Sequence, residues 1–190
     1  AISGTNVFVG SITSPLIRKI VDATTATAAA TTGAANVALN VPIVGRTSNG
    51  LGINALAISE GTLIVGQLEG LESLPNANTA PAGVQTSTTP VAANWNILDV
   101  QALLAPAAGK LLVASSMGVY SINLAVAGST PVLLTSKGIG RIPGVATPEQ
   151  LFLISGLGLN IAGDLLIGDD PYLGDFAAFG RLWTIPAGQF

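Results

Sequence analysis

The chain contains neither cysteine nor histidine among its 190 residues. These two absences exclude thiol nucleophiles, Ser–His relays, disulfides and the usual zinc sites. Charge is scarce as well, since charged residues make up 9% of the chain, against about 25% in ordinary soluble domains. The seven basic residues are scattered and the net charge is −3, whereas nucleic acids and anionic membrane surfaces are bound by clustered Lys and Arg. We therefore expect no nucleic-acid partner.

Long hydrophobic runs are also missing. Hydrophobic residues make up 49% of the chain, but 23 glycines and 11 prolines divide them into short segments. None of these segments approaches the roughly 20 apolar residues of a membrane-spanning helix, so no membrane span is expected. A surface with so little charge repels other copies weakly, which predicts self-association. The richness in Ala, Thr, Ser and Gly is typical of a secreted or cell-surface protein.

What the chain does contain is a short phrase repeated four times, a turn glycine followed by a strand of four or five mostly apolar residues. The glycines are Gly4, Gly61, Gly109 and Gly163, and the strands that they open are residues 6–10, 62–66, 111–115 and 165–169. A period of about 40–50 residues with several strands in each unit is typical of propeller blades. We therefore predict one all-β domain, a β-propeller of about four irregular blades or a propeller part completed by another chain. The predicted blade units are residues 1–46, 47–92, 93–137 and 138–190.

Between the strands, two segments are predicted to be connections. Residues 70–89 contain Pro75 and Pro81 among polar residues, and they are predicted to form a surface excursion with a short outer strand at 83–87. Residues 105–109, with the sequence APAAG, are predicted to be a turn.

The repeat is incomplete at both ends of the chain. Unit one shows no strand before Ser3, and unit four shows none after Gln189. Unpaired strand edges at these places would invite another chain to pair with them. Three explanations stay open: a small closed ring within one chain, a part that a second copy or another chain completes, or a strand miscounted at one end.

Two stretches resemble a known family. Residues 48–66 (SNGLGINALAISEGTLIVG) resemble the NGLA…DGTLYVA phrase of lactonase/gluconolactonase-like and NHL-type propellers. Residues 158–185 resemble their G-nLyVaD…GrvwrI phrase, and residues 111–122 are a shorter version of it. The resemblance covers about half of the chain and implies the same fold, in line with the repeat.

The lactonase branch of this family holds a divalent metal in its central channel through a Glu, Asn residues and an Asp. The resemblance places Asn49 on the Asn-Gly ligand position, whereas Ser155 stands where the family has its Asp. A serine cannot replace a carboxylate as ligand and base, and the N-terminal Glu has no counterpart. The resemblance therefore supports the fold and argues against lactonase chemistry.

Two groups of carboxylates are further candidates. Asp169, Asp170 and Asp175 cluster in a Gly- and Pro-containing loop, where such oxygens either hold Ca²⁺ or cap backbone N–H groups of turns. Glu60 and Glu72, together with Glu69, flank the second unit. Glu60 lies in an expected hairpin turn that points to solvent and no acid–base partner is evident, so no catalytic residue is predicted.

Aromatic residues gather in the last unit. Tyr172 and Phe176 lie in its Gly-rich loop and are the candidates for contact with a partner or a carbohydrate. Trp183 lies in a predicted strand, where packing between blades is the favoured interpretation.

The sequence thus favours a non-enzymatic secreted or surface module that binds or builds a structure. We expect it to self-assemble through strand edges and its low-charge surface. Two alternatives stay open. One is a divergent hydrolase-like propeller with a divalent metal at Asn49 and Asp169 or Asp170, and the other is a carbohydrate-binding propeller that uses Tyr172 and Phe176.

Overall fold

The structure of the chain, a computed structural model, is built from short β-strands. It describes residues 1–12, 14–23, 36–40, 52–68, 70–80, 83–84, 89–91, 100–115, 118–126, 128–134, 154–169 and 181–190. These residues form sixteen strands and no helix, which confirms the predicted all-β class. Within the same ranges, no helix is long and apolar enough to cross a membrane.

The strands form four small sheets. The first sheet has the order β1-β2-β3-β4-β8, with β1 Ile2–Ser3, β2 Asn6–Ser11, β3 Ser14–Ile20, β4 Asn36–Asn40 and β8 Gly83–Val84. The second has the order β5-β6-β7-β9, with β5 Ala55–Ser59, β6 Thr62–Gln67, β7 Gly70–Leu74 and β9 Thr89–Pro90. All neighbours in these two sheets are antiparallel except β4 and β8, which run parallel.

The other two sheets are antiparallel throughout. The third has the order β10-β11-β12-β13, with β10 Val100–Ala107, β11 Lys110–Ser115, β12 Gly118–Asn123 and β13 Val132–Leu133. The fourth has the order β14-β15-β16, with β14 Ile154–Leu159, β15 Leu165–Asp169 and β16 Arg181–Ile185.

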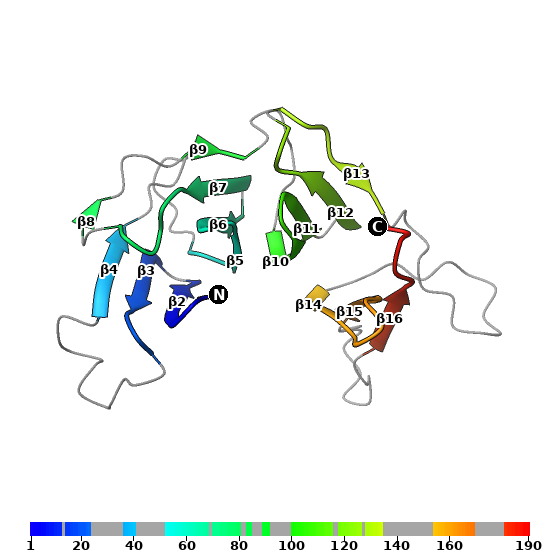
Figure 1. The fold of residues 1–190 in the computed structure, drawn as a ribbon, viewed down its shortest axis with the longest axis horizontal. Helices are drawn as coiled ribbons and strands as arrows, with labels where there is room; N and C mark the ends of the chain where they lie inside the picture. The colour runs from blue at the N-terminus through cyan, green and yellow to red at the C-terminus, as the bar shows by residue number, and fades with distance from the viewer. Residues whose placement is uncertain are drawn as a thin grey trace.

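The four sheets lie side by side in an arc that is open on one side (Figure 1). Strands β5, β10 and β14 line the inner side of the arc, where β10 contacts both β5 and β14, and β1 contacts β5. The described strands do not close into a ring, because the first and fourth sheets stand apart at the two ends of the arc.

Three hydrophobic clusters hold the arc together, one between each pair of neighbouring sheets. The first cluster joins Phe8 and Ile17 of the first sheet to Leu63 and Val65 of the second. Successive residues of a strand point to opposite faces, so an inner sheet must be apolar on both faces. For this reason β6 and β11 read as unbroken apolar runs instead of alternating ones.

The four repeated glycines open hairpin turns, as the repeat predicts. Gly4, Gly61, Gly109 and Gly163 have φ values of 59°, 77°, 68° and 84°, a left-handed backbone that glycine adopts without steric cost. The strands that follow them are β2, β6, β11 and β15, and each is the second strand of its sheet rather than the first. The sequence phrase therefore marks the middle of each sheet.

Three sequence-based expectations were wrong in detail. Residues 70–74 form strand β7 instead of a surface excursion. Leu71 and Leu74 are buried on opposite faces of this strand, so the segment lacks the regular alternation of apolar and polar residues that marks a strand with one buried face. Residues 105–107 continue strand β10, where a register shift in the ladder accommodates Pro106. A short strand, β1, is present at Ile2–Ser3, where no strand was predicted to precede Ser3.

Candidate interaction faces

Most of the predicted binding and metal residues lie outside the described ranges. They are Asn49, Asp170, Tyr172, Asp175 and Phe176. Asp169 is the last residue of β15, and its backbone is paired with Ile154 and Arg181 on either side. The Ca²⁺ and carbohydrate hypotheses therefore stay predictions. In the described part of the chain, no three acidic residues come close enough together to hold a metal ion.

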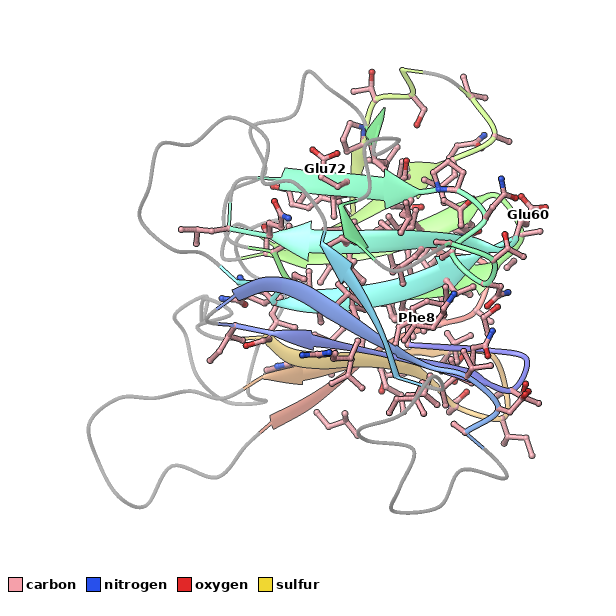
Figure 2. All side chains as sticks on the ribbon, turned by 90° about the vertical axis from the view of Figure 1, so that its left-hand side faces the viewer. Phe8, Glu60 and Glu72 are labelled. Carbon is pink, nitrogen blue, oxygen red and sulfur yellow. The ribbon has the colours of Figure 1, made fainter. Side chains whose placement is uncertain are left out.

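Glu60 and Glu72 do not form a pair. Glu60 is exposed in the β5–β6 hairpin turn, whereas Glu72 is buried in the middle of β7, away from that turn (Figure 2). The Oε2 atom of Glu72 has no hydrogen-bond partner among the described residues, and burial raises the pKa of its carboxyl group. Glu69 lies outside the described ranges. The two carboxylates that are described are thus too far apart to act together on one bond.

The third strand of each sheet, which is β3, β7, β12 or β16, carries an apolar residue at the same position relative to the middle strand. Ile17, Leu71, Val119 and Leu182 lie opposite Gly10, Gly66, Ala114 and Gly168 of the middle strands, respectively. The first three point toward the next sheet of the arc, and their exposed fractions are 0%, 4% and 0%. Leu182 belongs to the last sheet, and its side chain is 67% exposed. An apolar side chain at this position is therefore in the core in the first three sheets and on the surface in the fourth.

The middle strands repeat this pattern. Phe8, Ile64 and Leu112 point toward the next sheet and are buried there. Leu166 is the fourth residue of this series and is only partly buried. We call the outward surface of the fourth sheet the C-face, and its residues are Gly156, Gly158, Leu166, Gly168, Leu182 and Thr184.

The opposite end of the arc shows the complementary pattern. Val65, Val113 and Ile167 each point back toward the preceding sheet and are fully buried. Val9 is the equivalent residue of the first sheet, and its side chain is 48% exposed. We call the outward surface of the first sheet the N-face, and its residues are Ile2, Val7, Val9, Arg18 and Ile20.

One charged residue lies within the N-face. Arg18 is exposed and pairs with Val9 across the β2–β3 ladder. The equivalent position in the second sheet, opposite Val65, is Glu72, which is buried against the first sheet. Tyr120 and Trp183 occupy the same position in the third and fourth sheets. Packing between neighbouring sheets therefore accommodates a long side chain, and even an ionisable one, at this position.

Glycine permits the close approach of neighbouring sheets. A Cβ atom on Gly10 would lie 2.5 Å from Ile53 Cγ2, and one on Gly66 would lie 2.5 Å from Val100 Cγ1. A Cβ on Gly156 or Gly158, by contrast, would meet no atom within 4 Å. The glycines of the C-face therefore lie on an open surface, whereas the glycines of the inner faces lie in tight contact with the neighbouring sheet.

A buried lysine fastens the first sheet to the second. Lys19 Nζ donates to the carbonyl oxygens of Asn78 and Ala80 at 2.9 and 2.7 Å, and more weakly to that of Ala77 at 3.4 Å. These carbonyls belong to the turn that follows β7, so charge-assisted hydrogen bonds from the ammonium group link the two sheets.

Sequence reasoning missed the two end faces. The signal was present in the repeat itself, since aligning the four phrases shows that all four middle strands are apolar at both alternating sets of positions. An end sheet that packs on only one neighbour needs only one apolar face, whereas the middle strands of all four sheets are apolar on both.

Comparisons with known proteins match the fold and no family. No family model matches the chain, and no curated protein matches it. A solved structure of "the extracellular domain of the putative one component system BT4673 from B. thetaiotaomicron" resembles the chain with a TM-score of 0.56 at 12% sequence identity. The similarity covers 86% of this chain and 19% of that one, so the chain spans about a fifth of that protein's length. At this identity the similarity shows the fold alone.

Proposed function

We propose that this chain is a non-enzymatic structural or binding module of an extracellular, propeller-like kind. Each sheet corresponds to one blade, and the N-face and C-face are the joints at which further sheets complete the arc. The observation that supports this most directly is that residues at equivalent positions are buried between neighbouring sheets but exposed on the two end faces. Leu182 is 67% exposed where Ile17 and Val119 are fully buried.

The energetics favour covering these faces. Burying an exposed Val, Ile or Leu side chain contributes about 1.5–3 kcal/mol. The N-face offers the exposed Ile2 and Val9, and the C-face offers the exposed Leu182 with the partly buried Leu166. Association costs about 4–15 kcal/mol in lost freedom before any net affinity appears. A joint between one N-face and one C-face buries side chains from both, so the gain is of the same order as this cost.

Three further features support the extracellular and non-enzymatic parts of the proposal. The similar solved structure is an extracellular domain. The chain lacks cysteine and histidine and carries 9% charged residues. Among the described strands, β16 is the outermost of the fourth sheet, which is the position that the edge-assembly hypothesis gives to a pairing strand.

Dye binding tests whether the two faces are open apolar surfaces in the free chain. At protein concentrations too low for association, we expect anilinonaphthalene sulfonate to fluoresce on the chain. The fluorescence should fall in Val9→Arg and in Leu182→Arg, each of which charges one face. Val132→Arg is the matched control, because Val132 is 61% exposed on the third sheet and belongs to neither face. Equal fluorescence in all four proteins would overturn the proposal.

A further inference from the structure

We infer that the occupant of both end faces is a second copy of this chain, with the N-face of each copy packed on the C-face of the other. This inference rests on the proposed function and names the partner of the same surfaces. Two copies joined in this way form a closed pair with two identical joints. Because the joints exchange under a two-fold axis, such a pair has the symmetry that is commonest among soluble oligomers.

The first argument is that this type of interface already occurs three times within the chain. At each inner interface, a surface equivalent to the C-face, such as Phe8 and Ile17, meets a surface equivalent to the N-face, such as Leu63 and Val65. A second copy supplies the missing N-type and C-type surfaces together. A partner with only one of them would leave the other face uncovered.

The second argument is the number of sheets. The described residues of each chain form four sheets, and propellers close with about four to eight blades. Two arcs joined at both ends would contain eight sheets, which lies within that range. A third copy would exceed it, so the inference predicts a pair and not a longer ring.

The third argument is charge. Arg18 is the only charged residue of the N-face, and none of the six C-face residues is charged. Packing two N-faces together would bring two guanidinium groups to one interface, where like charges repel. Packing an N-face on a C-face places Arg18 against uncharged groups, one of which, the Thr184 hydroxyl, can accept a hydrogen bond from the guanidinium.

Light scattering coupled to size-exclusion chromatography, over a tenfold range of concentration, tests the inference. We expect a mass of twice 18.9 kDa at the upper end of the range. Val9→Arg and Leu182→Arg should each reduce the mass to that of one chain, because either change damages both joints, and should weaken association more than about tenfold. Val132→Arg should leave the pair intact.

Mixing the two variants gives the sharpest outcome. A pair of one Val9→Arg chain and one Leu182→Arg chain has one joint free of both changes, so the mixture should recover two-chain species that neither variant forms alone. Far-UV circular dichroism should show all variants folded, since both side chains are exposed in the single chain.

Three results would overturn the inference. They are a mass of 18.9 kDa for the unmodified chain at every concentration, loss of association in Val9→Arg but not in Leu182→Arg, and open polymers. If the dye experiment succeeds while the mass stays that of one chain, the faces are open joints whose partner is not a second copy. In that case the inference fails and the proposed function stands. If the dye experiment fails, the proposed function itself is wrong.

Discussion

Replacing Gly66 by alanine tests how closely the second and third sheets pack. A Cβ atom at this position would lie 2.5 Å from Val100 Cγ1 and 3.3 Å from both Ala55 Cβ and Leu103 Cδ1. Val100 is fully buried, so its side chain cannot turn away into solvent. The added methyl group must therefore push the two sheets apart or force Val100 into an unfavourable rotamer.

The magnitude follows from two opposing terms. Overpacking of a well-packed core costs about 1–3 kcal/mol. Replacing Gly by Ala also restricts the unfolded chain, which stabilises the fold by about 0.4–1 kcal/mol where the backbone permits it. Gly158→Ala is the matched control, because a Cβ there would meet no atom within 4 Å. The second term is common to both variants, so their free energies of unfolding should differ by about 1–3 kcal/mol.

Urea unfolding followed by far-UV circular dichroism measures this difference. The protein concentration must stay below that at which chains associate, because Gly158 belongs to the C-face. We expect Gly66→Ala to unfold at lower urea than the unmodified chain, and Gly158→Ala at equal or higher urea. Equal unfolding midpoints for the two variants would refute the close approach of the second and third sheets.

Two further predictions concern the seam between the first and second sheets. Burial raises the pKa of Glu72 above its ordinary value of 4.5, so the folded chain binds this proton more strongly than the unfolded chain. The free energy of unfolding should therefore fall as the pH rises from about 4.5 through the raised pKa, and Glu72→Gln should remove this fall. Urea titrations at several pH values check this, and parallel pH curves for the two proteins would contradict it. Lys19→Met should lower stability by about 1–3 kcal/mol, because the carbonyls of Asn78 and Ala80 lose their donor. The melting temperature should then fall by several degrees at constant pH, and an unchanged value would show that water replaces the ammonium group.

The end faces show how far the sequence predicts a site. The four repeated phrases reveal which residues point to the same face of each sheet. The strand pairing then shows that Val9 is equivalent to Val65, and Leu182 to Ile17. Nothing in the local sequence distinguishes a covered member of the series from an open one. That distinction depends on whether another sheet lies against it.

The class of fold and the position of its hairpins follow from local sequence patterns. Turn chemistry is local, so Gly61 and Gly109 mark their hairpins wherever the strands later pack. Three other features are seen only in the folded chain. They are the order of neighbouring sheets, the pairing of β8 with β4 of the first sheet, and the burial of Glu72. These features depend on contacts between residues far apart in the chain. Their energies come from area removed from water, and that area is defined only once the sheets have come together.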